Sequence, residues 1–382
     1  MWPNAPTAHR LQPSRRTIPW PAARHIFAAV CPIALQTCGS WWRIGAMIFA
    51  AKKVRQILKK PHQNRALAGQ HGHDLSPVFD RTASVKADSL LAFVVCRNEI
   101  VRLPYFLEYY RSQGVEHFFL IDNDSDDGTT AFVEKQPDCS LWTTSASYKD
   151  SLFGVHWLNH LLGKYGTGHW CLTLDPDEFL IIPYGDTRDI KDATIYLDSQ
   201  KKENLFSVMI DMYPEGAVDA AVYHRGQNPL EVAPWFDPTG YYQEQRPQCD
   251  WWIRGGVRRR VFFHDEPWNA PALNKTVLVK WKRHFVYLSS THVLSPFRLN
   301  NPHFRDTLAP TGCLLHFKYL ALIKTKIEEE MQRRQHYAGS REYQRYHKML
   351  SSHSHLWCEG SARFENWRQL VDLGLMNTGR WF

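Results

Sequence analysis

The chain has 382 residues, of which 44% are hydrophobic and 22% charged, and 46 Lys and Arg stand against 38 Asp and Glu. This composition supports a buried core and excludes a wholly disordered chain, a collagen and a disulfide-rich miniprotein. The net charge of +8 comes from one end, because residues 1–80 hold eleven Lys and Arg but only two acids, Asp74 and Asp80. The rest of the chain is close to neutral and lacks the electrostatic footprint of a nucleic-acid-binding protein, so we expect no nucleic acid partner.

The eight cysteines form no Cys-x-x-Cys pair. Cys96 and Cys171 lie in apolar, strand-like runs, where a reduced and buried thiol is the usual state. The cysteine spacing predicts neither a zinc site nor a disulfide framework, and it favours a reducing compartment. We expect a cytoplasmic protein, at the inner face of the membrane if its basic end binds lipid.

Residues 1–88 are predicted to form a basic N-terminal arm and linker, disordered in part. An uncharged stretch separates Arg24 from Arg43, but proline and polar residues interrupt it, and we favour a segment that does not span a membrane. Residues 47–60 place apolar residues at helical spacing, with lysine and arginine between them. This pattern is typical of an amphipathic helix lying on an anionic membrane, although a helix docked on the body explains it equally well. Residues 61–88 are predicted to be a linker.

The segment that follows alternates strand and helix signals. Residues 91–96 are a continuous apolar run, as in a buried parallel strand, and residues 103–113 show helical apolar spacing before Gly114. Residues 117–121 are the next apolar run, and the polar turn 122–129 after them precedes a second helix. Alternating strands and helices with short links predict a mostly parallel sheet covered by helices.

The same alternation continues toward the middle of the chain. A short strand is predicted at 141–143, a helix at 151–165 and a further buried strand at 170–174. Residues 317–382 show helical apolar stripes, and we predict a helical C-terminal region packed on the sheet. The predicted fold class is therefore α/β, with the sheet domain over residues 89–316.

Two acidic clusters follow strands of this predicted sheet, at residues 122–127 and 175–178. Ligands of open α/β sheets bind beyond the carboxyl ends of the strands, which is where both clusters fall. In an extended segment, residues two apart point the same way, so Asp175 and Asp177 are expected to face one point. Paired carboxylates suit Mg²⁺ or Mn²⁺, which keep open positions for phosphate oxygens.

Several motifs occur in a fixed order along the body of the chain. They are Cys-Arg-Asn-Glu at 96–99, Asp-Asn-Asp-Ser-Asp-Asp-Gly-Thr at 122–129, Asp-Pro-Asp-Glu-Phe at 175–179 and Leu-Leu-His-Phe-Lys-Tyr at 314–319. This series resembles the family 2 type glycosyltransferases, and it is most similar to a bacterial branch with an Asp-x-Asp-Glu-Phe (DxDEF) motif. The resemblance implies a GT-A fold and transfer of a sugar from a nucleotide-sugar donor, with UDP-sugars favoured, to a polysaccharide, other glycan or glycolipid acceptor.

The resemblance also implies roles for individual residues. The loop after the first strand and the acidic turn would bind the nucleotide, through Asn98, Glu99, Asp122, Asn123 and Asp124. Asp175 and Asp177 would hold a divalent metal, Mn²⁺ or Mg²⁺, against the diphosphate. His316 would complete the metal shell, with His292 as the second choice. Family members commonly carry two adjacent acids in the turn, and Asn123 replaces the second, which leaves open which member of the turn contacts the nucleotide.

Sugar transfer leaves negative charge on the nucleoside diphosphate, which a metal and fixed cations stabilise. Arg258 and Lys275 are the first candidates for these cations, followed by Arg260 and Lys280. An inverting transfer, which we expect here, also needs a carboxylate base near the acceptor hydroxyl. The catalytic candidates are Asp177, Glu178 and Asp211, with Asp265 and Glu266 as further candidates for the base.

Two other functions compete with this interpretation. A non-catalytic, membrane-associated scaffold would keep the fold but tolerate the loss of a carboxylate or of the late histidine, and all of these are present. A phosphohydrolase with an aspartate nucleophile also carries Asp-x-Asp after a strand, but it needs Thr or Val where Phe179 stands. We therefore expect an enzyme, a metal-dependent glycosyltransferase.

Overall fold

The structure, a computed structural model, describes residues 60–245, 251–300, 309–333, 337–352 and 354–381. The predicted membrane-binding helix at 47–60 lies outside these residues except for Lys60, and so does the uncharged stretch before it. Within the described ranges, no helix combines the length and the apolar character that a membrane crossing requires.

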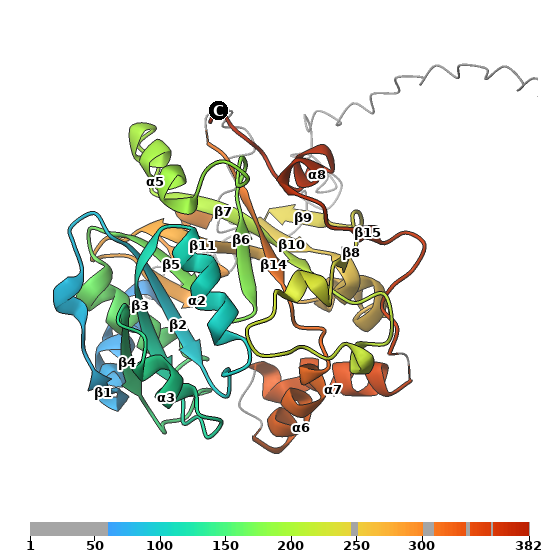
Figure 1. The fold of residues 1–382 in the computed structure, drawn as a ribbon, viewed down its shortest axis with the longest axis horizontal. Helices are drawn as coiled ribbons and strands as arrows, with labels where there is room; N and C mark the ends of the chain where they lie inside the picture. The colour runs from blue at the N-terminus through green and yellow to red at the C-terminus, as the bar shows by residue number, and fades with distance from the viewer. Residues whose placement is uncertain (1–59, 246–250, 301–308, 334–336, 353, 382) are drawn as a thin grey trace, which may run out of the picture. The chain divides into compact units, whose positions relative to one another are not determined.

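Nine strands of the described residues form the central sheet (Figure 1). They are β1 (Ser76–Phe79), β2 (Leu90–Cys96), β3 (Val115–Asp122), β4 (Cys139–Thr143), β5 (Trp170–Leu174), β6 (Glu178–Ile181), β7 (Asn204–Asp211), β11 (Asn274–Lys280) and β14 (Gly312–His316). Their order is β1-β4-β3-β2-β5-β11-β7-β14-β6. Six of the nine run in one direction, because β1, β11 and β6 run against the others. The mixed, mostly parallel sheet confirms the predicted α/β class.

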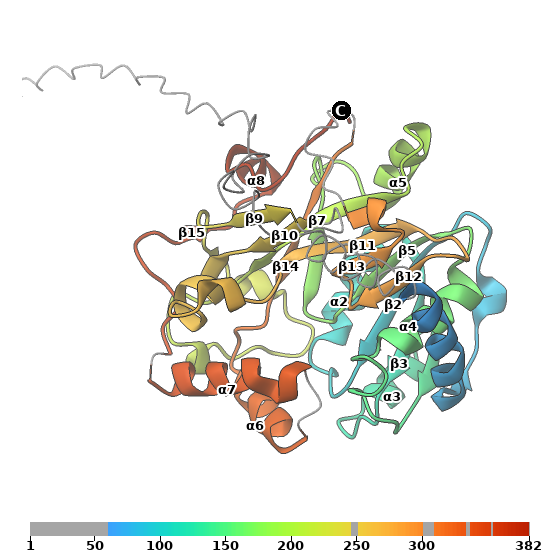
Figure 2. The ribbon, with the colours of Figure 1, turned by 180° about the vertical axis from the view of Figure 1, so that it is seen from behind.

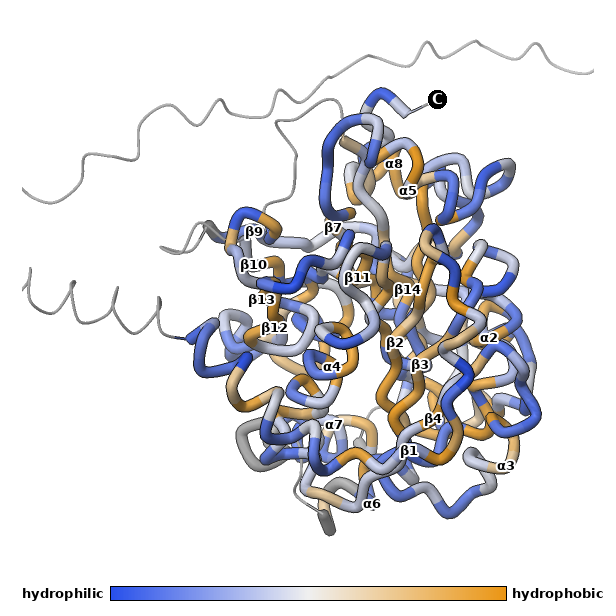
Figure 3. Tube along the Cα trace, turned by 90° about the vertical axis from the view of Figure 1, so that its left-hand side faces the viewer, coloured by the Kyte–Doolittle hydropathy of each residue, from blue (hydrophilic) through white to orange (hydrophobic). Residues whose placement is uncertain are grey.

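Helices cover both faces of this sheet (Figures 1 and 2). One hydrophobic core joins the sheet to α2 (Leu103–Ser112), α3 (Thr129–Glu134), α5 (Ile190–Ser199) and α8 (Trp367–Asp372), and a second joins it to α4 (Val155–Leu161) and the π-helical turn Leu162–Gly166. Side chains alternate along β2, so Val94 faces the first core and Phe93 the second. Figure 3 shows the resulting hydrophobic centre, with hydrophilic segments around it.

The C-terminal region adds a third core. α6 (Leu322–Arg333) contributes Ile323 and Ile327, and α7 (Tyr337–Ser352) contributes Tyr346 and Leu350. Both helices lie at the end of the sheet toward which the arrowheads of β2 and β3 point (Figures 1 and 2). They are therefore placed at the edge where the predicted site residues are expected.

The remaining elements are short. Two-stranded sheets are formed by β8 (Trp235–Phe236) with β15 (Ala362–Arg363), by β9 (Tyr242–Gln245) with β10 (Trp251–Arg254), and by β12 (Val286–Ser289) with β13 (Val293–Ser295). Single 3₁₀ turns span Gly72–Asp74, Thr82–Ser84, Val218–Ala220, Pro229–Glu231, Pro267–Asn269 and Phe297–Asn300, and a second π-helical turn spans Arg258–Phe262.

Residues 61–88 are not the linker that the sequence pattern predicted. Residues 60–71 are helical, and β1 pairs antiparallel with β4 at the edge of the sheet. Arg81 anchors the chain beyond β1, since its guanidinium donates to the carbonyls of Gln136 and Cys139, each at 3.0 Å. The prediction was wrong because β1 is a largely exposed edge strand, and such a strand carries no continuous apolar run.

Candidate active site

The carboxyl ends of the parallel strands bring most of the predicted site residues to one edge of the sheet. Asp122 ends β3, Asp211 ends β7 and His316 ends β14, while Glu178 begins the antiparallel strand β6. In the strand register, His316 is paired with Asp211 on one side and with Glu178 on the other. The sheet itself therefore sets these groups together, at the position where open α/β sheets bind their ligands.

Asp211 is held by two partners at this edge. Arg258 donates to both carboxylate oxygens, with Nε–Oδ2 of 2.7 Å and Nη2–Oδ1 of 2.8 Å, and His316 Nδ1 lies 2.6 Å from Oδ1. All three side chains are buried. Burial alone would raise the pKa of Asp211, but the charge of Arg258 and the hydrogen bond with His316 hold that pKa below its ordinary value. Asp211 is therefore an anion that orients His316.

The other ring nitrogen of His316 faces Asp177. Its Nε2 lies 3.6 Å from Oδ2 of Asp177, and both side chains are largely buried. Burial would raise the pKa of Asp177, but the charges of His316, Arg102 and Lys326 together lower it. Asp177 is therefore ionised at neutral pH and surrounded by positive charge.

Asp175 and Asp177 turn to different partners, in contrast to the expectation that both face one point. The amide of Glu178 donates to the carbonyl of Asp175 at 3.0 Å, which closes a turn, so the side-chain alternation of an extended segment does not apply. The Asp175 carboxylate is 55% exposed and lies 3.3 Å from Nζ of Lys275. The same Nζ lies 2.5 Å from Oε1 of Glu178.

Glu178 and Lys275 form a buried ion pair beneath the turn. Burial raises the pKa of Glu178, and the charge of Lys275 opposes that shift. Burial would lower the pKa of Lys275, but Glu178 and Asp175 raise it, so the ammonium stays charged. The ion pair fixes Glu178 at the end of the Asp-Pro-Asp-Glu motif, and the Glu178 carboxylate is buried away from solvent.

The acidic turn after β3 is shaped by its own side chains. Asp122 accepts hydrogen bonds from the hydroxyl groups of Ser125 and Thr130. The Nδ2 of Asn123 donates to two backbone carbonyls beyond β4, at 3.0 and 3.1 Å. Both residues are buried, whereas the carboxylate of Asp124 is 69% exposed. Of the three candidates within the turn, Asp124 is the one whose carboxylate faces solvent.

The loop after β2 is tied to this turn. Asn98 has a left-handed φ of 51°, and its Oδ1 accepts a hydrogen bond from the amide of Asp126 at 3.0 Å. Arg97 donates from Nη1 to the carbonyls of Asn123 and Asp124, at 2.7 and 2.6 Å. Asn98 therefore supports the shape of the turn.

Two cations that the sequence pattern did not single out converge on Glu99. Nη1 of Arg102 lies 3.1 Å from Oε2, and Nζ of Lys326 pairs with Oε1. Lys326 comes from α6, 227 residues further along the chain, so no local pattern links it to Glu99. Arg102 stands three residues after Glu99, and its position beside the motif is the signal that could have identified it.

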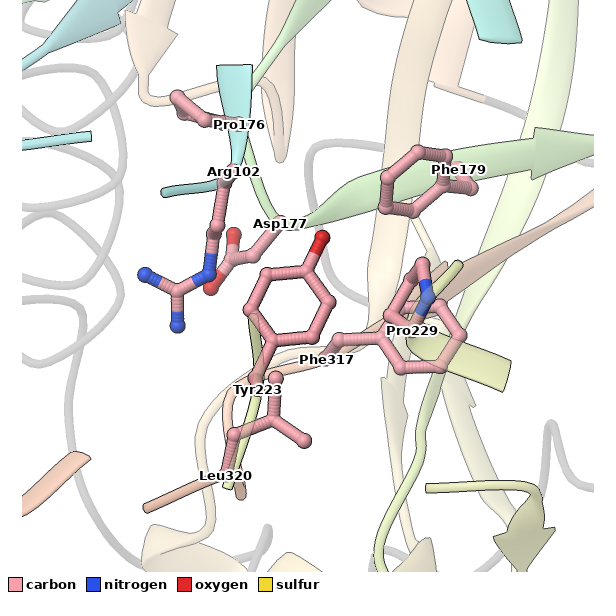
Figure 4. Close-up of a pocket in the computed structure, with 8 residues that line it drawn as sticks. All are labelled: Arg102, Pro176, Asp177, Phe179, Tyr223, Pro229, Phe317 and Leu320. Carbon is pink, nitrogen blue, oxygen red and sulfur yellow. The ribbon is translucent and has the colours of Figure 1, made fainter. Parts of the chain in front are cut away.

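A small pocket lies against Asp177 (Figure 4). It is lined by Arg102, Pro176, Asp177, Phe179, Tyr223, Pro229, Phe317 and Leu320. Aromatic and proline side chains form most of the wall, and Asp177 and Arg102 supply its charged part. The amide of Phe317 donates to the carbonyl of Asp177 at 2.9 Å, which joins the end of β14 to the turn. Its empty volume is about 160 Å³, which is smaller than the ~300–1,000 Å³ of ordinary ligand pockets.

His292, the second choice for a metal ligand, is engaged elsewhere. Its Nδ1 lies 2.7 Å from the carbonyl oxygen of Asn274. Burial and the nearby charge of Lys275 lower the pKa of His292 to about 3. His316 is thus the histidine that the fold brings to Asp177.

The other four candidates, two cations and two carboxylates, form ion pairs of their own. The pairs are Arg260–Asp237 at 2.8 Å, Lys280–Asp198 at 2.7 Å, Arg345–Asp265 at 2.7 Å and Arg345–Glu266 at 2.9 Å. These contacts account for the four charges without a role at the predicted metal site.

Asp177 and His316 offer a divalent cation one oxygen and one nitrogen donor. A carboxylate behind the other nitrogen of a metal-binding histidine is the usual support for such a ligand, and Asp211 occupies that place. Asp175 would have to turn away from Lys275 to join them. Across the ranges that the structure describes, no group of three or more His, Cys, Asp or Glu side chains is arranged to hold a metal ion. Of the three predicted ligands, Asp177 and His316 lie together, and Asp175 is turned toward Lys275 instead.

Comparison with known proteins identifies no family for this chain. No protein-family model matches the chain, and no curated protein is significantly similar to it. The geometry of the site is therefore the basis for a function.

Proposed function

We propose that this protein is a metal-dependent glycosyltransferase with a GT-A fold, which moves a sugar from a nucleotide-sugar donor to a glycan or glycolipid acceptor. The observation that carries the proposal is the series Asp211, His316 and Asp177 at the carboxyl edge of the sheet. His316 is held at Nδ1 by a buried carboxylate and presents Nε2 toward Asp177 at 3.6 Å. Such a pair of donors, on the same edge as an acidic turn, suits a nucleotide diphosphate with its cation.

Donor binding is assigned to the acidic turn and the loop before it. Asp124 is our choice for the contact with the nucleoside, because its carboxylate is exposed at the edge. Asp122, Asn123 and Asn98 keep the turn in shape through their internal hydrogen bonds. A UDP-sugar is the favoured donor, on the ground of the sequence resemblance.

Mn²⁺ or Mg²⁺ is the proposed cofactor, with Asp177 and His316 as its ligands. When bound, such a cation stabilises the negative charge that develops on the leaving diphosphate. A ligand role requires the ring of His316 to be neutral, with its proton at Nδ1 toward Asp211 and the lone pair at Nε2. The positive charge around Asp177 keeps its carboxylate ionised, as a metal ligand requires.

Glu178 and Asp211, two of the predicted catalytic carboxylates, receive positioning roles. Each is buried against a cation, Lys275 or Arg258 respectively. A general base has to reach the proton of an acceptor hydroxyl, and a carboxylate enclosed in an ion pair is poorly placed for this. The acceptor is proposed to bind beside Asp177, next to the aromatic side chains of Phe179 and Phe317.

Membrane contact through residues 47–60 remains part of the proposal. It is supported by the concentration of lysine and arginine at the N-terminal end of a chain whose remainder is nearly neutral. A basic amphipathic segment would bring the enzyme to the inner face of the membrane, where glycolipid acceptors are found.

Binding of UDP in the presence of Mn²⁺ tests the proposed function. Asp177→Asn keeps the side-chain shape but removes the charge that would hold the cation, so UDP affinity should fall more than tenfold, or about 1.4 kcal/mol. Asp198→Asn is the matched control, because Asp198 pairs with Lys280 on the surface. Its affinity for UDP should equal that of the parent.

Calorimetry that shows the same UDP affinity for the parent and for Asp177→Asn, with and without chelator, would refute the metal-dependent site. A parent protein that binds neither UDP nor GDP would instead favour the non-catalytic scaffold. Thermal unfolding of both variants checks that a loss of affinity does not come from a loss of fold.

A further inference from the structure

Helix α6 reaches from the C-terminal region onto the loop after β2. Lys326 and Glu329 are three residues apart on this helix and therefore lie on the same face. Lys326 pairs with Glu99, and Glu329 accepts a hydrogen bond from Nε of Arg97 at 2.7 Å. Ile327, next to Lys326, is buried in the third core and fixes the helix in this position. The C-terminal region thus brings charged groups to the edge where donor binding is proposed.

One carboxylate at this contact, Glu99, is shared by two cations. These cations are Arg102 and Lys326, whereas Arg97 has Glu329 as its partner. The next carboxylate is Asp177, which lies within electrostatic reach of both cations. Two carboxylates therefore balance two cations here. A divalent metal at Asp177 would add two positive charges, and a diphosphate is a ligand of the complementary charge.

Both cations keep hydrogen-bond donors that Glu99 does not use. Nε of Arg102 is buried and has no hydrogen-bond partner among the residues that the structure describes. An ammonium group carries three N–H donors, and Lys326, with a side chain 32% exposed, pairs through its Nζ with one oxygen of Glu99. A buried donor without a partner is destabilising, because it has lost its hydrogen bonds to water without gaining a replacement. An anion placed between these two cations would satisfy them.

We propose that Lys326, together with Arg102, binds the diphosphate of the nucleotide-sugar donor, and that α6 is therefore part of the donor site. This inference rests on the proposed function, because it takes the phosphates of that donor as the ligand. Arg102 lines the pocket beside Asp177, and Lys326 shares the Glu99 carboxylate with Arg102, so both cations lie at the edge that carries Asp177. Lysine suits this place because its ammonium is a compact charge on a flexible stem. Glu99 holds Lys326 in place as its counter-ion.

Lys326→Gln tests this assignment, with Lys324→Gln as the matched control. Lys324 lies on the same helix and carries the same charge, but it pairs with Asp219 at 2.8 Å, away from Glu99. UDP binding is measured by calorimetry and uridine binding by saturation-transfer NMR, both with diamagnetic Mg²⁺ present. We expect Lys326→Gln to weaken UDP binding at least tenfold, with uridine binding unchanged. Lys324→Gln should bind both as the parent does.

The other outcomes separate the inference from the proposed function. Equal UDP affinity in Lys326→Gln and the parent, or an equal loss in both variants, would overturn the inference while the proposed function stands. Loss of UDP and uridine binding alike in Lys326→Gln would show that Lys326 supports the shape of the loop, and would also overturn it. If the parent binds neither UDP nor GDP, the proposed function fails and the inference fails with it.

Discussion

The substitution Asp211→Asn removes one negative charge from an almost fully buried ion pair. Asp211 accepts hydrogen bonds from Arg258 at 2.7 and 2.8 Å, and it lies 2.6 Å from His316 Nδ1. Asparagine keeps the shape of the side chain, but one of its two polar atoms is a donor that faces the guanidinium. Because the change leaves a buried charge without its counter-ion, the free energy of unfolding should fall by about 3–5 kcal/mol.

Urea unfolding at pH 7 measures this loss, with Asp198→Asn as the control. Asp198 and its partner Lys280 are both exposed, so the control should lose no more than about 1 kcal/mol. In a thermal scan the melting temperature of Asp211→Asn should fall by about 6–10 °C, taken at ~2 °C per kcal/mol. A loss no larger than that of the control would refute the idea that the Asp211–Arg258 pair holds the site together.

The pH dependence of the same pair gives a second test. Burial would raise the pKa of Asp211, but Arg258 and His316 hold it below its ordinary value. The stability from such a group is fully present above the unfolded carboxyl pKa of about 4, and it is lost as the pH falls through the folded pKa. The difference in stability between the parent and Asp211→Asn should therefore be constant from neutral pH to about pH 5 and shrink below about pH 4. A difference that persists unchanged to pH 2 would contradict the ionised pair.

Two further predictions concern the core and the N-terminal arm. Phe93 is fully buried and stacks on Phe119 with 4.5 Å between ring centroids, so Phe93→Ala should lower the free energy of unfolding by about 3–5 kcal/mol. Ile195→Ala, at an exposed position of α5, should change it by less than about 0.5 kcal/mol. Deleting residues 1–59 should leave thermal unfolding unchanged but abolish co-sedimentation with anionic vesicles at low salt. Equal sedimentation of the truncated and full chains would remove the membrane role.

Local apolar patterns were enough to predict the parallel half of the sheet. β2, β3, β4 and β5 begin and end within two residues of the predicted runs. These strands are buried, so their sequences are nearly continuous apolar runs that stand out against the turns between them. The edge strand β1 was missed for the opposite reason, since its side chains are largely exposed and carry no such signal.

The site was predictable in its residues but not in its contacts. Asp177 was identified because it follows a predicted strand, whereas His316 was named from an ordered motif and Asp211 as a candidate base, with no strand predicted before either. The cations that pair with the carboxylates of the site are distant in the sequence. Arg258 is 47 residues from Asp211, and Lys326 is 227 residues from Glu99. The turn at 175–178 also contradicts the expectation of an extended segment, and Asp175 followed by Pro176 is a residue pair that β-turns favour at their first two positions.

The three carboxylates of the Asp-Pro-Asp-Glu motif at 175–178 differ in burial and in the charged groups beside them. Glu178 is enclosed with Lys275, whereas Asp177 lies beside His316 with positive charge around it. Asp175, two residues earlier, is 55% exposed and contacts Lys275 at 3.3 Å. If Asp175 turns away from Lys275, the buried ammonium still has Glu178 as its counter-ion. The site therefore combines a fixed part, in which Asp211 orients His316, with an adjustable carboxylate. This combination explains why two of the three predicted metal ligands already lie together and the third does not.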